Sequence, residues 1–244
     1  MKHAIVEFCI KPINGYNQIL IMKRVYLFMS LVLYCVAGAF AQQPGLPAEK
    51  EAYMEVITQR AAKITAALQL NDVARQEKVA NIIRDQYSNL NDIYTERDAA
   101  LKVIKEKLQD KAAIETAVKA QAVKTDAKLA KLHKKYLSKL SSQLNEEQIE
   151  QVKNGMTYNV LPNTYKAYQE QILTLTDDQK KQILAWLTEA REHAIDAESA
   201  EKKHAWFGKY KGRINNYLSA AGYDLKKEGA EWEKRRKAAA AKVN

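Results

Sequence analysis

The chain is short of cysteine, glycine and proline. Its 244 residues include two Cys, eight Gly and four Pro. So few cysteines exclude a disulfide framework, and so little Gly and Pro exclude collagen-like and low-complexity sequences. With 47% hydrophobic residues, the chain can bury enough surface to offset the entropy lost on ordering, which excludes wholesale intrinsic disorder. The composition therefore predicts a globular protein of one domain, or at most two small ones.

A short apolar run near the N-terminus is typical of a secretion signal. Lys23 and Arg24 precede the apolar residues 25–40, and Ala39 and Ala41 flank Phe40 at the end of this run. A basic start, a short apolar stretch and an A-x-A site together favour cleavage between Ala41 and Gln42. The run is shorter than the roughly 20 residues that a membrane-spanning helix needs. We therefore predict a signal peptide over residues 22–41.

The predicted cleavage leaves 203 residues that contain no cysteine. Cys9 and Cys35 are both removed, and residues 1–21 look like an over-extended start upstream of Met22. The mature chain then has no disulfide, no thiol nucleophile and no transmembrane segment. We expect it to be exported, either to the periplasm or into the medium, where a chain without thiols avoids oxidative mispairing.

The mature sequence favours helices throughout. No Gly or Pro occurs between Ala48 and Asn154, where strong helix formers dominate. Strict two-residue alternation, typical of strands, is missing. Apolar residues instead recur at spacings of three and four: Tyr53, Ile57, Ala61, Ile64 and Leu68, then Val79, Ile83, Leu90 and Tyr94, and later Ile114, Val118, Leu129, Leu132, Tyr136 and Leu140. We predict an all-α bundle of about seven helices, with long N-terminal hairpins and shorter C-terminal helices.

The sequence also indicates where several helices begin and end. Capping boxes are predicted at Asn145–Gln148 and at Thr176–Gln179, and Gly222 is placed to end a helix. We expect a single α-helical domain over residues 48–225. Residues 226–244 follow as a basic helix or tail with seven Lys or Arg and three Glu.

The choice of aromatic residues is unusual for a helical core. Beyond residue 41 there are ten Tyr and three Trp but a single Phe. Tyr and Trp combine an apolar face with a polar atom, which suits wet grooves and interfaces. Nine of these thirteen residues follow residue 150. They either fill gaps between short helices or line a ligand-binding groove.

The densest aromatic stretch, residues 204–217, predicts a binding site on one helix. Trp206, Tyr210, Arg213 and Tyr217 share a helical face. Rings beside a guanidinium and nearby amides can stack on a sugar and bind its hydroxyls or carboxylate. The predicted ligand-binding residues are Trp206, Tyr210, Arg213, Asn216, Tyr217 and Tyr223.

Two further features of this stretch bear on that site. Gly208 and Gly212 would leave a bare strip where a ligand or another backbone can come close, with the amides of Asn215 and Asn216 beyond it. The competing interpretation is an ordinary core stripe that shares Tyr210 with the predicted site. That stripe consists of Phe207, Tyr210, Ile214 and Leu218.

Catalytic and metal signatures are weak. There is no G-x-S-x-G elbow, no phosphate-binding Gly-rich loop and no H-E-x-x-H motif. Glu201 with His204 has the spacing used in di-iron bundles, but a second copy is missing. Two Glu could meet in the fold to cleave a glycoside, although nothing in the sequence singles out such a pair. We predict no metal and no cofactor, and we favour a protein that is not an enzyme.

The charge points to anionic partners. The mature chain keeps 35 basic and 28 acidic residues, a net +7. Predicted export and the lack of a binding motif argue against nucleic acid. Uronate-containing polysaccharides or oligosaccharides, lipid head groups and unfolded acidic proteins remain as anionic partners outside the cytoplasm.

Several segments resemble one family. They are residues 85–98, 154–158 and 190–193, and above all the run from His204 to Leu218 and on to Asp224. The chain is similar there to the family called domain of unknown function 3826. The resemblance implies an exported protein of Bacteroidota-type bacteria, encoded near genes for polysaccharide degradation, pectin among them. It implies no established activity and no catalytic residues.

Three functions follow as hypotheses. The first is a non-catalytic exported protein that binds a glycan, or a partner in pectin-type polysaccharide utilisation. The alternative is a periplasmic holdase acting on an envelope protein, because the helix starts at 144–148 and 175–179 are similar to those of Spy- and CpxP-type chaperones. The third is an enzyme that acts on oligosaccharides.

Overall fold

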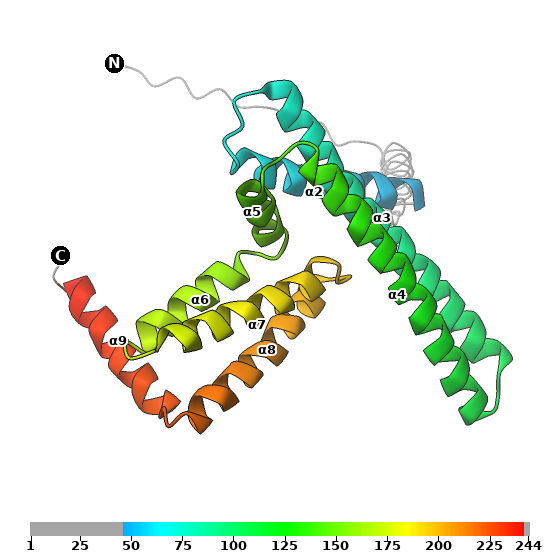
Figure 1. Cartoon of the computed structure of the whole chain (residues 1–244). Coiled ribbons are helices and arrows are strands. Elements are labelled where there is room, and N and C mark those ends of the chain that lie inside the picture. The colour runs from blue at the N-terminus through cyan, green and yellow to red at the C-terminus, as the bar shows by residue number, and fades with distance from the viewer. Residues whose placement is uncertain (1–45, 242–244) are drawn as a thin grey trace, which may run out of the picture. The chain divides into compact units, whose positions relative to one another are not determined.

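The computed structural model describes residues 46–241 of the chain (Figure 1). The predicted signal peptide and over-extended start lie outside these residues. The chain divides into two units, residues 1–51 and 52–244, and of the first only residues 46–51, the beginning of a helix, are described. Residues 46–241 form eight helices and no strand. The all-α prediction is confirmed.

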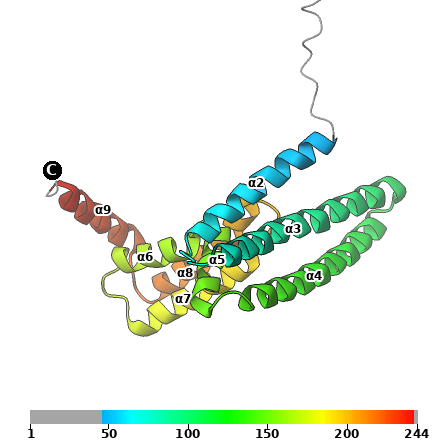
Figure 2. The same cartoon turned by 90° about the horizontal axis from the view of Figure 1, so that it is seen from above.

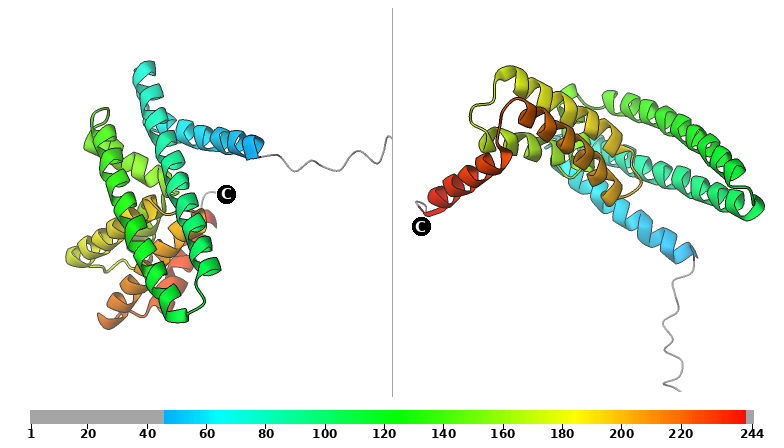
Figure 3. Two further views of the ribbon diagram at one scale, coloured as in Figure 1. Left: turned by 90° about the vertical axis from the view of Figure 1, so that its right-hand side faces the viewer. Right: turned by 90° about the horizontal axis from the view of Figure 1, so that it is seen from below.

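The helices fall into the two predicted length classes. They are α2 (Leu46–Ala66), α3 (Val73–Lys107), α4 (Lys111–Ser141), α5 (Glu146–Met156), α6 (Val160–Gln171), α7 (Asp177–Ile195), α8 (Ala200–Ala220) and α9 (Leu225–Ala241). The longest, α3 and α4, pack on each other as an antiparallel hairpin (Figure 2). The later helices are shorter, and α7 and α8 form a second hairpin (Figure 3).

Side-chain caps set several of the helix boundaries. Asn145 and Thr176 begin α5 and α7, each in a reciprocal capping box with the Gln three residues on. Such a box satisfies two backbone N–H groups that the first turn would leave without partners. Gly222, with φ of 94°, follows the end of α8 in a conformation that glycine adopts without strain. All three predicted boundaries are confirmed.

Two hydrophobic cores stabilise the unit from residue 52 onward. The first joins α2, α3, α4 and α5, and it also takes in Ile195 from the end of α7. The second joins α6, α7 and α8. The predicted core stripe of α8 lies in this second core, where Phe207, Tyr210, Ile214 and Leu218 are all buried.

A polar junction ties the α7–α8 loop to the α3–α4 hairpin. Asp196, just after α7, accepts hydrogen bonds at its carboxylate from Gln86 Nε2 (3.2 Å) and contacts His133 Nδ1 at 2.6 Å. The Tyr94 hydroxyl donates to the Asp196 backbone carbonyl at 2.7 Å. The Nζ of buried Lys203 donates to the carbonyls of Ala194 and Ile195, the last residues of α7. The loop is therefore fixed from both sides.

The last helix, α9, lies against α6 and the end of α8. None of its side chains is fully buried. Leu225 packs against the second core. Polar contacts add to this: Arg235 Nη2 donates to the carbonyls of Glu170 and Gln171, while Gln171 Nε2 donates to the Leu225 carbonyl at 3.2 Å. Within residues 46–241, no helix has both the length and the apolar character required to cross a membrane.

Candidate functional site

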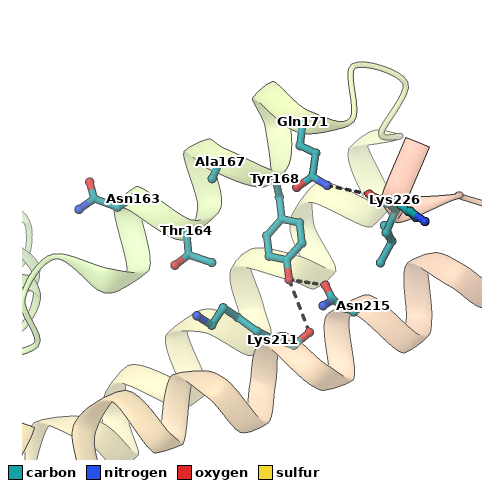
Figure 4. A pocket seen from close by; sticks show the side chains of 9 residues that line it. Asn163, Thr164, Ala167, Tyr168, Gln171, Lys211, Asn215 and Lys226 are labelled. Carbon is teal, nitrogen blue, oxygen red and sulfur yellow. Dashed lines mark hydrogen bonds between the residues drawn. The ribbon is translucent and has the colours of Figure 1, made fainter. Parts of the chain in front are cut away.

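The largest described cavity lies between α6 and α8, where α9 begins (Figure 4). Its volume of about 570 Å³ falls within the range of small-ligand sites. We call it the lysine pocket. It is lined by Asn163, Thr164, Ala167, Tyr168 and Gln171 of α6, by Lys211 and Asn215 of α8, and by Leu225 and Lys226 of α9.

Helical spacing brings these side chains to one place. Asn163, Ala167 and Gln171 are four residues apart on α6, as are Lys211 and Asn215 on α8. Residues four apart lie one above the other on a helix. Each helix therefore presents one polar strip, and the packing of both helices on α7 leaves the two strips facing a common space.

Tyr168 connects the two walls of the lysine pocket. Its ring lies in the second core, and its hydroxyl donates to Asn215 Oδ1 at 2.7 Å, with a longer contact of 3.5 Å to the Lys211 carbonyl (Figure 4). Burial raises the pKa of Tyr168 to about 12, so the hydroxyl remains a donor at neutral pH. Since Tyr168 occupies Oδ1 of Asn215, the amide offers its Nδ2 group to a ligand.

The charges of the lysine pocket are all of one sign. Lys211 and Lys226 are its charged residues, and none of the nine lining residues is acidic. Asp224, close by in sequence, is engaged with its own helix end: its Oδ1 accepts from the backbone N–H groups of Lys226 and Lys227 at 3.1 and 3.0 Å. Two ammonium groups among amides and hydroxyls suit an anion that also carries hydroxyls.

The predicted glycine strip is open and lies on the same side of α8 as the lysine pocket. Gly208 and Gly212 occupy the helical face of Lys211 and Asn215. A Cβ built at either glycine would meet nothing within 4 Å. No part of the described chain fills this strip, so it extends the accessible surface from the lysine pocket toward His204.

Three of the six predicted binding residues lie on the opposite side of α8. At about 100° per residue, the face of Trp206, Arg213 and Tyr217 is about half a turn from that of Lys211. Trp206 stacks on His193 at 4.3 Å between ring centroids, and Arg213 lies over Trp186 at 4.5 Å. Tyr217 meets Trp186 edge-on at 5.3 Å. We call this set, from α7 and α8, the aromatic ladder.

The other three predicted residues are not brought together. Tyr210 is buried in the second core, where burial and the nearby Glu189 carboxylate raise its pKa to about 12. Asn216 is exposed and does not line the lysine pocket. The Tyr223 hydroxyl donates to the Thr174 carbonyl at 3.0 Å and contacts Gln179 Oε1 at 2.9 Å, joining two interhelical loops. Tyr210 and Tyr223 thus have contacts that account for their place in the fold.

A second cavity, of about 490 Å³, touches the ladder at Trp206. Its charged side chains include two cations, Arg97 and Lys202, against four carboxylates, those of Asp126, Glu192, Asp196 and Glu198. Arg97 is already paired with both Asp98 and Glu198. The excess of carboxylates disfavours an acidic ligand there, although Trp206 could stack on a sugar.

Metal ligation finds no support in residues 46–241, where no group of three or more His, Cys, Asp or Glu is arranged to hold an ion.

Most residues of the lysine pocket lie on α6 and α9 and were missed by reasoning from the sequence. A signal was present, because residues 163, 167 and 171 repeat small or amide side chains at four-residue spacing in a short helix. The sequence could not indicate that this strip faces α8.

Comparison with known proteins places the chain in one family. A search of curated proteins finds no match. A family model described as "Protein of unknown function (DUF3826)" matches residues 54–238, which include every helix except the first turns of α2 and the end of α9. The segments on which the resemblance rests all lie within this range. The chain therefore belongs to the DUF3826 family.

Proposed function

We propose that this protein binds an acidic oligosaccharide in the lysine pocket without cleaving it. One observation carries the proposal: the largest described cavity pairs Lys211 and Lys226 with amide and hydroxyl groups and contains no carboxylate. A uronate sugar offers the complementary groups, namely one carboxylate and several hydroxyls on a compact ring. The ammonium groups would bind the carboxylate as point charges, which requires no planar geometry.

The remaining lining groups suit the rest of such a sugar. Asn163, Thr164 and the Asn215 amide can exchange hydrogen bonds with hydroxyls. Ala167 and Leu225 supply small apolar contacts. The open strip at Gly208 and Gly212 gives a neighbouring sugar of the same chain a place to lie close to the α8 backbone. A short oligosaccharide therefore fits better than an isolated anion.

The lining argues against glycoside hydrolysis at the lysine pocket. Most glycosidases need two carboxylic groups that flank the scissile bond. None of the nine lining residues supplies one. Predicted export and the polysaccharide context implied by the family resemblance support a binding role in the use of acidic plant polysaccharides.

Affinity electrophoresis and calorimetry with polygalacturonate and its short oligomers test the proposal. We expect Lys211→Met and Lys226→Met each to weaken binding about tenfold, because each removes a hydrogen bond to a charged group. Lys209→Met is the matched control: it makes the same change on α8 but lies beside Trp206 on the aromatic ladder. Binding that survives in both pocket variants would contradict the proposal, as would equal binding of fully methyl-esterified polygalacturonate.

The holdase alternative stays a prediction. A holdase needs a continuous apolar surface for unfolded chains. The large apolar side chains exposed in the described part are spread over four helices and two loops: Val56, Val73, Val103, Val123, Tyr158, Leu173 and Leu184. This distribution does not favour a chaperone over a glycan-binding protein.

A further inference from the structure

We infer that a third cavity, separate from the lysine pocket, is a binding site for one neutral sugar unit. It lies where α2, α3 and the α7–α8 loop meet and has a volume of about 280 Å³. We call it the tyrosine pocket. Its lining includes four of the ten tyrosines that follow residue 41, namely Tyr53, Tyr87, Tyr94 and Tyr158.

Two of these rings are held by hydrogen bonds of their hydroxyls, and a third, Tyr87, is partly buried. Tyr53 donates to the Tyr87 carbonyl at 3.0 Å, and Tyr94 donates to the Asp196 carbonyl at 2.7 Å. Burial raises the pKa of Tyr87 to about 12. With the hydroxyls of Tyr53 and Tyr94 fixed, the rings offer apolar surface to the cavity, and aromatic surface beside polar groups suits the apolar face of a sugar ring.

Tyr158 is placed in the tyrosine pocket by an unusual backbone. Tyr158 has φ of 58° and Asn159 has φ of 54°, two successive left-handed residues without a glycine. The backbone N–H of Asn159 donates to the Asn154 carbonyl at 2.8 Å and that of Tyr158 to the Gly155 carbonyl at 3.3 Å, so the left-handed turn ends α5 in a Schellman motif. The Tyr158 side chain is nevertheless 45% exposed, and its ring stacks on His204 at 5.4 Å. The turn that ends α5 therefore directs a largely exposed ring to the tyrosine pocket.

The charge of the tyrosine pocket selects a neutral ligand. Its two cations, Arg60 and Lys203, equal its two carboxylates, Asp98 and Glu198, in number. Both carboxylates pair with Arg97 outside the lining, and the Lys203 ammonium donates to the Ala194 and Ile195 carbonyls, so three of the four charged groups are already engaged. Hydroxyl and amide groups of Asn91, Thr95 and Ser199 complete the polar lining. The volume is about half that of the lysine pocket, so we assign it a single ring. The assignment does not depend on acidic sugars binding in the lysine pocket.

Saturation-transfer NMR and calorimetry with methyl glycosides of galactose, arabinose, rhamnose and glucose test the inference. Tyr158→Gly removes the ring and relaxes the backbone, so the variant should fold. Asn159→Gly relaxes the next residue and keeps the ring, which makes it the matched control. We expect at least one glycoside to bind the wild type and Asn159→Gly alike, and to bind Tyr158→Gly at least tenfold more weakly.

Two further measurements separate this site from the lysine pocket. Lys211→Met should leave binding of the neutral glycoside unchanged, whether or not that variant loses polygalacturonate. Methyl galacturonoside should compete poorly for the tyrosine pocket. The inference would be overturned if none of the four glycosides bound, if Tyr158→Gly bound like the wild type, or if the acidic glycoside bound there more tightly than every neutral one.

Discussion

At the scale of single residues, Arg191 is the most deeply buried charge in the described part of the chain, with 1% of its surface exposed. Its guanidinium donates to Asn154 Oδ1 at 2.9 Å and also bonds Glu150 and Glu192. Partial burial of Glu150 opposes its ionisation, but the hydrogen bond and charge of Arg191 outweigh this effect and hold the Glu150 pKa below its usual value. Arg191 thus joins α7 to α5 through charge-assisted hydrogen bonds.

Replacing Arg191 should destabilise the fold. Arg191→Met keeps most of the volume but removes the bonds to Asn154 and Glu150, and we expect a loss of about 1–3 kcal/mol in the free energy of unfolding. Urea denaturation measures this loss. Arg84→Met is the control: its ion pair with Asp85 is nearer the surface, and we expect a change of no more than about 0.5 kcal/mol. Equal effects would show that the Arg191 contacts contribute little.

A second residue-scale prediction concerns pH. The hydrogen bond that His133 donates to the Asp196 carboxylate raises the pKa of His133, and burial opposes this rise. The charges of Asp196 and Glu192 add to the rise, while Lys153 reduces it. Because the folded pKa exceeds the unfolded value of about 6.5, the stabilisation is fully present below pH 6.5 and is lost as pH rises through the folded pKa.

His133→Gln should abolish this dependence. We expect the wild type to exceed the variant in unfolding free energy by more at pH 5.5 than at pH 8.5, measured by urea denaturation at both values. The other groups around the His133–Asp196 pair are unchanged in the variant, including Gln86 and Tyr94, which both bond Asp196. A difference that is the same at both pH values would contradict the role of the His133–Asp196 pair.

At the scale of helices, two glycines that both lie within helices differ in the space around them. Gly155, in the last turn of α5, faces α2, and a Cβ there would lie 3.1 Å from two carbons of Ile64. Gly208, in α8, would meet nothing within 4 Å. The first glycine permits two helices to approach, whereas the second only lowers helix propensity.

Alanine should therefore change stability in opposite directions at these positions. Gly155→Ala should cost about 1–3 kcal/mol, because the Ile64 side chain, which packs against the first core, would have to shift to admit the new methyl group. Gly208→Ala should stabilise by about 0.5–1 kcal/mol through helix propensity. Thermal and urea unfolding of the two variants test the contrast. Stabilisation by Gly155→Ala would mean that α2 and α5 are not closely packed there.

The last helix gives a second prediction at this scale. Because α9 buries no side chain fully but supplies Leu225 and Lys226 to the lysine pocket, deletion of residues 225–244 should keep most helical content and weaken polygalacturonate binding. Circular dichroism and affinity electrophoresis measure the two effects. Retention of full affinity would remove α9 from the proposed site.

At the scale of the whole molecule, net charge complicates any test of anion binding. The chain carries +10 at neutral pH, and a basic surface attracts polyanions without a specific site. Salt separates the two contributions, since the Debye length falls from about 10 Å at 0.1 M to about 3 Å at 1 M. Contacts inside a cavity are screened less than exposed ones.

We therefore expect polygalacturonate to retard the wild-type protein at both low and raised salt, while neutral dextran does not retard it. The double variant Lys211→Met with Lys226→Met should be retarded at low salt alone. The measurement is affinity electrophoresis at two ionic strengths. Complete loss of wild-type retardation at raised salt would assign the binding to surface charge rather than to the lysine pocket.

Much of the architecture could be predicted from local chemistry. The α class, the capping boxes at Asn145 and Thr176, the stop at Gly222 and the core stripe of α8 depend on neighbours within a few residues, so the sequence alone determined them. The open strip at Gly208 and Gly212 was also predictable, since it needs only helical spacing and the lack of a side chain.

Which face of α8 lines the largest described cavity was decided by tertiary structure. The sequence drew attention to Trp206, Arg213 and Tyr217, and α7 supplies those side chains with partners at Trp186 and His193. The lysine pocket forms on the opposite side because α6, which is distant from α8 in sequence, packs there together with α9. This packing brings Tyr168 and Lys226 to Lys211. Helical periodicity predicts which residues share a face of a helix, but not which faces are covered by other helices. The covered faces depend on how the apolar stripes of all the helices are buried together.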